Sequence, residues 1–292
     1  MMLHPAPGSL TIAVIALCCV AAAPPAYAQS ATAWETVPHG AARLIAGAAH
    51  EAADGVWLRA GVEISLAPGW HTYWRYPGAS GVPPSFEFAG SENVKSVTVL
   101  WPAPVVFADG AGSRSIGYVE HVVFPLRVVA RDASKPALLH VDLRYAICRE
   151  LCQPAEATLT LVLSAVVDPS ASEAVLAAAE ARVPRPVALD ESAAFGIRSV
   201  HREADHGRPH VVVDVAAPEG MPIDLLVEGP TPDWALPLPR PIAPVPGGAP
   251  NVHRFAFDLD GMPSGARSEG AMLRFTLVSS ADAVEIVSSL SP

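Results

Sequence analysis

Charge of either sign is scarce in this sequence, and long apolar runs are missing after the N-terminus. Only 16% of the 292 residues are charged, whereas 51% are hydrophobic. Disordered chains have the opposite composition, so most of this chain should fold. The net charge is −10, and no cluster of lysine and arginine stands out. A nucleic-acid partner is therefore not expected, because phosphate backbones demand such a cluster. After the N-terminus, no stretch reaches the ~18 apolar residues of a membrane span.

The first 28 residues have the features of a secretory signal peptide. They contain no Lys, Arg, Asp or Glu, and an apolar run extends from Leu10 to Ala23. Ala26-Tyr27-Ala28 then gives a small-x-small cleavage motif. We therefore expect residues 1–28 to be removed, the mature chain to begin at Gln29, and the protein to be exported to the periplasm.

Cysteine is scarcer still, with four residues, and its positions matter. Cys18 and Cys19 lie in the apolar run and leave a lipid anchor or an uncleaved leader as alternatives. Leu17 argues against lipidation, because a small residue usually precedes a lipidated cysteine. Cleavage leaves only Cys148 and Cys152. An oxidising compartment permits a disulfide between them, and copper or zinc could also bind them there.

The pattern of apolar residues predicts an all-β fold. Thirty prolines and twenty-one glycines disfavour long helices and suit short strands joined by turns. Apolar and polar residues alternate over 56–66, 139–147 and 159–163, which is typical of half-buried strands. The aromatic residues of 70–76 are expected mostly to pack the edge of the sheet structure. One helix is predicted over Ser172–Arg182, with Ser172 as its cap.

The length of the chain suits two domains of about 100–150 residues each. Strands at this spacing, separated by turn signals, indicate antiparallel β-sandwiches. After the helix, four further segments are expected to be strands: His210–Val215, Ile223–Val227, Arg254–Leu259 and Met272–Val278. The expected division is a signal peptide (1–28), a first sandwich (29–167), a helical linker (168–189) and a second sandwich (190–292).

Cys148 and Cys152 are expected at the end of a β-hairpin. Across such an end, their Cα atoms can come within the ~4.4–6.8 Å that a disulfide needs. A ring this small removes little entropy from the unfolded chain, so it stabilises less than a long-loop bridge. Thiol–disulfide exchange needs an accessible sulfur and a nearby resolving thiol, and this spacing supplies both. The residues alone leave open a redox pair, a structural disulfide or a metal site, for which His71 and His121 are candidate ligands.

Three segments resemble a known protein family: Gly69-Trp70-His71-Thr72-Tyr73-Trp74-Arg75-Tyr76-Pro77-Gly78, Ser80-Gly81-Val82-Pro83-Pro84 and Tyr145-Ala146-Ile147-Cys148-Arg149-Glu150-Leu151-Cys152-Gln153-Pro154. Over roughly residues 50–165 they resemble the N-terminal periplasmic domain of the thiol–disulfide interchange protein DsbD. The resemblance is closer still to the ScsB (suppressor of copper sensitivity) type of N-terminal region, whose second sandwich resembles residues 190–292. The resemblance implies that the sandwiches are immunoglobulin-like.

The resemblance also implies a thiol–disulfide oxidoreductase, a component of a protein-disulfide reductase system, without a cofactor or a metal. Cys148 and Cys152 would be its redox-active disulfide and catalytic pair. Their partners would be a membrane-embedded DsbD- or ScsB-type reductase or a thioredoxin-like domain, and periplasmic disulfide-bonded proteins of cytochrome c biogenesis or copper tolerance. A cap loop shields the pair in DsbD, and Phe107 and Asp109 are its candidate residues here. The alternatives are a copper-handling protein and a non-catalytic sandwich with a structural disulfide.

Overall fold

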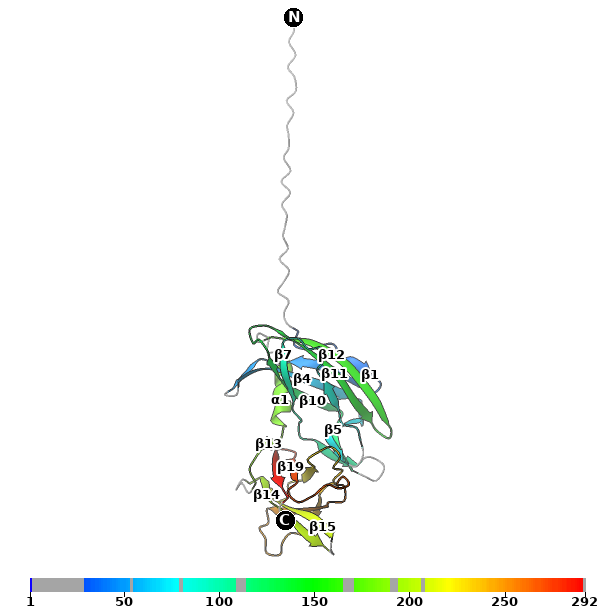
Figure 1. The fold of residues 1–292 in the computed structure, drawn as a ribbon. Helices are drawn as coiled ribbons and strands as arrows, with labels where there is room; N and C mark the ends of the chain where they lie inside the picture. The colour runs from blue at the N-terminus through cyan, green and yellow to red at the C-terminus, as the bar shows by residue number, and fades with distance from the viewer. Residues whose placement is uncertain are drawn as a thin grey trace.

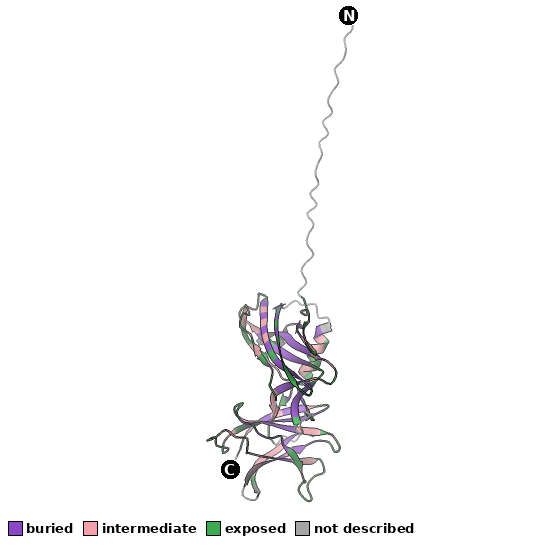
Figure 2. Ribbon diagram, turned by 90° about the vertical axis from the view of Figure 1, so that its right-hand side faces the viewer, coloured by how far each residue is buried: buried purple, intermediate pink, exposed green. Residues whose placement is uncertain are grey.

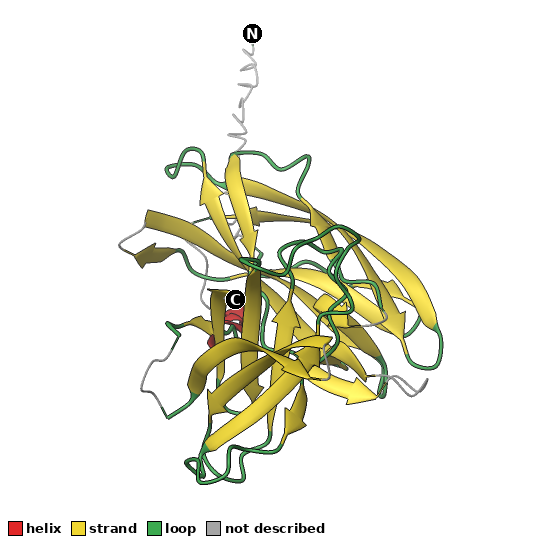
Figure 3. Ribbon diagram, turned by 60° about the horizontal axis from the view of Figure 1, so that its bottom comes forward, coloured by secondary structure: helices red, strands yellow, loops and turns green. Residues whose placement is uncertain are grey.

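A computed structural model describes residues 29–52, 55–78, 81–108, 114–164, 171–189, 194–205 and 208–290, together with Met1. This part of the chain contains twenty strands and one helix, so the predicted all-β fold class is confirmed (Figure 3). Its one helix is too short to cross a membrane. The predicted signal peptide, apart from Met1, lies outside the described residues.

Two six-stranded sheets form the first sandwich, which is the upper body of Figure 1. One sheet has the order β1 (Glu35–Val37), β2 (Gly40–Ala46), β4 (Gly55–Leu66), β10 (His121–Ala130), β7 (Val94–Val99), with β3 (His50–Ala52) paired to β4. The other has the order β12 (Cys152–Leu163), β11 (Ala137–Cys148), β5 (His71–Gly78), β9 (Arg114–Val119), β8 (Val105–Ala108), with β6 (Ser85–Glu87) paired to β11.

The core of the first sandwich lies between these sheets. Successive side chains of a strand point to opposite faces, so the alternation along β11 and β12 gives each strand one apolar face. Leu139, Val141 and Leu143 of β11 are at most 1% exposed. Trp74 and Phe124 are fully buried in the same core. Figure 2 shows the resulting stripes of buried and exposed residues.

Two four-stranded sheets form the second sandwich. Their orders are β13 (Arg185–Pro186), β20 (Ala283–Ser289), β19 (Met272–Ser279), β16 (Ile223–Glu228) and β14 (Gly196–Asp205), β15 (Arg208–Ala216), β18 (Val252–Asp258), β17 (Arg240–Ile242). Apolar residues from both sheets form a second core, which includes Phe257 and Phe275. Each of the four strands predicted after the helix has a counterpart here.

The sheet that contains β16, β19 and β20 is buried on both faces. Leu225 and Val227 point into the second core, whereas Leu226 belongs to the core of the first sandwich. Val278 and Ala283 join Leu226 in that first core. The two sandwiches therefore pack against each other through apolar side chains. The exact domain limits, 167/168 and 189/190, remain a prediction.

The helix α1 (Ala171–Ala181) lies against the first sandwich. Its Leu176 is fully buried between Ile45 and Val123. The prediction that Ser172 caps the helix is wrong, because the helix begins one residue earlier. The Ser172 hydroxyl instead donates a hydrogen bond to the carbonyl of Ser30 at 3.1 Å.

Candidate functional site

Cys148 and Cys152 lie opposite each other at the end of a long hairpin. Strands β11 and β12 pair without interruption from Ala137 and Leu163 to Cys148 and Cys152, which confirms the predicted hairpin. The structure joins the cysteines in a disulfide with an S–S distance of 2.04 Å. Their Cα atoms are 4.1 Å apart, just below the range expected from the sequence.

The disulfide lies on the outer face of its sheet. Tyr145 and Ile147 point into the core of the first sandwich. Ala146 and Cys148 alternate with them and lie on the opposite face, together with Tyr73. Cys148 is only 1% exposed, whereas Cys152 is exposed. One end of the bond therefore faces solvent, and the other end is covered.

Strand β5 supplies the wall beside the disulfide. His71 pairs in register with Cys148, and the Tyr73 hydroxyl lies 3.3 Å from Cys152 Sγ, within hydrogen-bond distance of sulfur. Both side chains are buried, at 7% and 4% exposure, and their rings meet edge to face with centroids 5.5 Å apart. Sequence reasoning missed the role of Tyr73, because the aromatic residues of 70–76 were expected mostly to pack the sheet edge.

Two glycines bring the backbone close to this wall. A Cβ atom on Gly81, whose φ is +129°, would lie 2.5 Å from Cε1 of Tyr73. A Cβ atom on Gly117 would lie 2.1 Å from the carbonyl oxygen of Thr72. Only glycine allows approaches this close. Gly81 therefore packs directly on the Tyr73 ring, and Gly117 lets β9 approach β5.

The cap-loop candidates are placed only in part. Phe107 belongs to β8 and is partly buried. Its ring lies 4.5 Å from that of His71, measured between centroids, with the planes inclined at 55°. Phe107 therefore packs on His71, which pairs with Cys148. Asp109 lies outside the described residues.

The tip of the hairpin is open to solvent. Arg149 and Glu150 are exposed, and Leu151 is 79% exposed. Below the tip, on the core side of the sheet, burial raises the pKa of Tyr145 to about 12. The disulfide thus lies beside the exposed tip of the hairpin, and the opposite face of its sheet packs on the apolar core.

The two candidate metal ligands have different surroundings. His71 is next to the disulfide, whereas His121 Nε2 lies 3.0 Å from a carboxylate oxygen of Glu63. Within the described ranges, no group of three or more His, Cys, Asp or Glu side chains is arranged to hold a metal ion.

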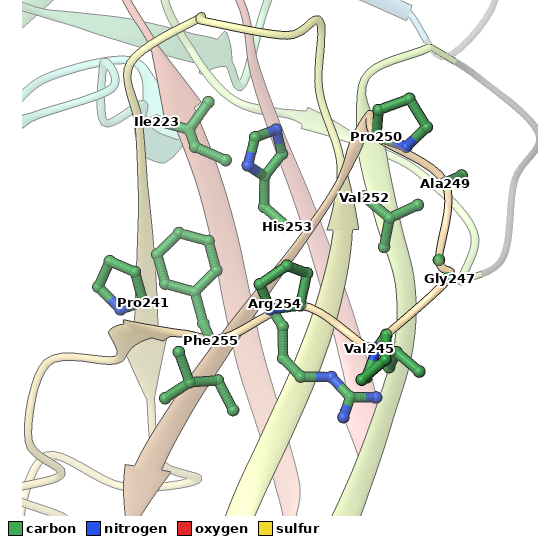
Figure 4. Close-up of a pocket in the computed structure, with 14 residues that line it drawn as sticks. Ile223, Pro241, Val245, Gly247, Ala249, Pro250, Val252, His253, Arg254 and Phe255 are labelled. Atoms are coloured by element: carbon green, nitrogen blue, oxygen red, sulfur yellow. The ribbon is translucent and has the colours of Figure 1, made fainter.

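A cavity of about 480 Å³ lies in the second sandwich, away from the cysteines. It is lined by the proline-rich loop that follows β17 and by residues of β16 and β18, including Ile223, His253 and Phe255 (Figure 4). Neither cysteine lines it.

Comparison with known proteins shows which class of domain the first sandwich and its disulfide resemble. Residues 44–164 match the family described as "Thiol:disulfide interchange protein DsbD, N-terminal". The matched range contains both cysteines and all of β5, β9, β11 and β12. The resemblance found in the sequence is thereby confirmed.

One solved structure extends this likeness. The N-terminal periplasmic domain of ScsB from Proteus mirabilis has the same fold, with a TM-score of 0.67 and 22% sequence identity. The alignment covers 90% of this chain and 98% of that one, so it includes both sandwiches. No curated protein matches the sequence of this chain.

Proposed function

We propose that this chain is a periplasmic thiol–disulfide interchange module with Cys148 and Cys152 as its redox-active pair. The placement of the disulfide carries the proposal. The bond joins an exposed Cys152 to a buried Cys148 on the outer face of a sheet. Exchange requires one sulfur that a partner can reach and a second that can resolve the intermediate. The match to the DsbD N-terminal family supports this interpretation.

The proposed reaction begins at Cys152, because its residue is the exposed one. A donor thiolate attacks Cys152 Sγ, the S–S bond breaks, and Cys148 leaves as a thiolate that takes up a proton. The second donor thiolate then attacks the donor sulfur of the mixed disulfide and releases Cys152. The donor ends as a disulfide, and the pair has gained two electrons and two protons.

The second half of the cycle reverses these roles. The Cys152 thiolate attacks a disulfide of a protein substrate, and one substrate sulfur leaves with a proton. Cys148 then attacks Cys152 Sγ and releases the second substrate sulfur, so the substrate is reduced and the Cys148–Cys152 bond forms again. The donor would be a DsbD- or ScsB-type membrane reductase or a thioredoxin-like domain, and the substrates would be periplasmic disulfide-bonded proteins.

Tyr73 is placed to assist both halves of this cycle. Its hydroxyl lies 3.3 Å from Cys152 Sγ. In the reduced protein, this hydroxyl would donate a hydrogen bond to the Cys152 thiolate. Hydrogen bonding to a charged form stabilises that form, so the contact would favour the thiolate that attacks the substrate.

A redox titration of the mature protein, residues 29–292, tests the proposal. In glutathione buffers of graded composition, the pair should equilibrate at a potential between roughly −120 and −270 mV, the range of thiol oxidoreductases. Cys148→Ala should accumulate a mixed disulfide through Cys152, because the resolving thiol is missing. Cys152→Ala is the matched control and should react more slowly, because Cys148 is buried.

Two results would contradict the proposal. A bridge that glutathione and thioredoxin cannot reduce would be a structural disulfide, and its potential would lie below about −300 mV. Tight copper binding by the reduced protein, without any exchange, would instead favour a copper-handling role.

A further inference from the structure

Strand β5 connects the disulfide to the second sandwich. Its first residues, His71 and Tyr73, lie beside Cys148 and Cys152. Two residues farther along, Arg75 contacts the second sandwich. Any effect of the second sandwich on the disulfide site would therefore be transmitted through β5.

The middle of β5 is not held by regular strand pairing. His71, Thr72 and Tyr73 pair in register with β9, and pairing resumes only at Gly78. Between these points, Trp74–Pro77 lie opposite the single residue Ile116. Extra residues of a bulge are left out of the ladder. Contacts of its side chains must therefore fix the position of this bulge.

Arg75 fastens the bulge to two strands of the second sandwich. Its Nε and Nη2 atoms donate to the two carboxylate oxygens of Glu228 at 2.9 and 2.7 Å, and Nη2 also donates to Glu285. The three side chains are only 21%, 15% and 16% exposed. Burial lowers the pKa of Arg75, but its hydrogen bonds to Glu228 and the charges of both carboxylates raise it overall. Bidentate, partly desolvated pairs of this kind are strong and directional.

The neighbours of Arg75 make the attachment rigid. The Tyr76 hydroxyl donates to the carbonyl of Leu236 at 2.6 Å, and the Arg75 guanidinium stacks 4.2 Å from the centre of the buried Trp74 ring. Glu285 also accepts hydrogen bonds from Arg274 and Thr276. Both ends of the Arg75–Glu285 contact are thus fixed by further partners.

We infer that the second sandwich is a positioning element of the disulfide site, and that Arg75, by fixing the bulge of β5, holds Tyr73 against Cys152. Tyr73 is the last residue of β5 that pairs with β9 before the bulge. Displacement of the bulge would therefore move Tyr73 before it disturbed Cys148, which is held by its own hairpin. The inference rests on the proposed function, since it assigns a role in exchange.

The test compares variants of the mature full chain in their equilibrium with glutathione. Arg75→Met keeps an unbranched apolar stem and removes the charged guanidinium group. Without the Tyr73 contact, the Cys152 thiolate is less stable, so the equilibrium should shift about three- to tenfold toward the disulfide, the size of one typical intramolecular hydrogen bond. In the reduced form of the same variant, the pH at which the rate of Cys152 alkylation is half-maximal should rise.

A double-mutant comparison separates positioning from general destabilisation. In the Tyr73→Phe background, Arg75→Met should add less than about a twofold shift, because the contact is already missing. Arg114→Gln is the matched control, since it removes an exposed ion pair between the first sandwich and Asp224 of the second, and it should leave the equilibrium unchanged. If Arg75→Met does not fold, Glu228→Gln, which keeps its size, provides the same comparison.

Equal shifts in the Tyr73 and Tyr73→Phe backgrounds, or no shift at all, would overturn the inference. Either result would leave the proposed function intact as long as the wild-type pair exchanges with glutathione. Failure of the wild-type protein to exchange would instead refute the proposed function itself.

Discussion

The two sandwiches are similar in architecture but differ in how they use an outer sheet face. In the first sandwich, the face that carries the disulfide is open to solvent at Cys152. In the second, the outer face of the sheet with β16, β19 and β20 is covered by the first sandwich, so Leu226 and Thr276 are 1% and 0% exposed. One architecture thus presents an exposed disulfide face in one half of the molecule and a covered sheet face in the other.

Cutting the chain between the sandwiches is the most drastic way to break this comparison. We expect limited proteolysis to cut near residues 168–189, at the ends of α1, because Leu176 holds the helix against the first sandwich. The fragments should separate on denaturing gels yet elute together in gel filtration, since apolar residues join them. A chain that stays intact under these conditions would argue against the predicted domain limits.

Substitution of Leu226 should weaken the contact between the sandwiches. Leu226→Ala removes a side chain that is 1% exposed and packs in the first core. Such truncations lower the free energy of unfolding by about 2–5 kcal/mol, which urea denaturation will measure. Val287→Ala, at a position 52% exposed on β20, is the control and should change it by less than about 0.5 kcal/mol. Equal effects of the two substitutions would mean that the contact contributes nothing.

Alkaline pH should also weaken the fold, through the same contact. Burial and the charge of Glu228 raise the pKa of Tyr76 to about 12. An unfolded tyrosine ionises near pH 10, so between pH 10 and 12 the unfolded state holds fewer protons, and stability falls as pH rises. The loss should be of order 2 kcal/mol by pH 12, and Tyr76→Phe should show a shallower decline. Identical pH profiles for the two proteins would contradict this assignment.

Reduction of the disulfide should have the smallest effect on stability. The bridge closes a very short loop, for which chain entropy gives about 2 kcal/mol at most. Reduction should therefore lower the melting temperature by only several degrees, and calorimetry with and without reductant will measure the shift. The second sandwich has no cysteine, so its circular dichroism signal, measured on its own fragment, should not respond to reductant. If the protein unfolded on reduction, the bond would be a structural disulfide instead.

The strands and the hairpin could be predicted because they depend on local patterns. Alternation along 139–147 and 159–163 marked β11 and β12, and the short spacing of Cys148 and Cys152 placed them at the hairpin end. The helix was predicted to within one residue at each end, which is the usual uncertainty of helix boundaries. Only its cap was misplaced.

The wall of the site could not be predicted, because it depends on contacts between distant segments. Tyr73 meets Cys152 only once β5 pairs with β11, and these residues are 79 positions apart. Arg75 and Glu228 are 153 positions apart, and nothing in the spacing of either residue indicates the other. The aromatic segment that seemed to serve a single packing role is divided among three: Trp74 in the core, Tyr73 at the disulfide and Tyr76 between the sandwiches.

The position of the disulfide on the outer face has a consequence for repeated turnover. Tyr145 and Ile147, which alternate with Ala146 and Cys148 along β11, pack in the core on the opposite face of the sheet, so they should stay there when the bond opens and closes. Each transfer of an electron pair would therefore break or form the S–S bond at the outer face of the sheet and leave the apolar core buried. NMR signals of core methyl groups should be the same in the oxidised and the reduced protein. The domain would then pass through many cycles of reduction and oxidation without refolding.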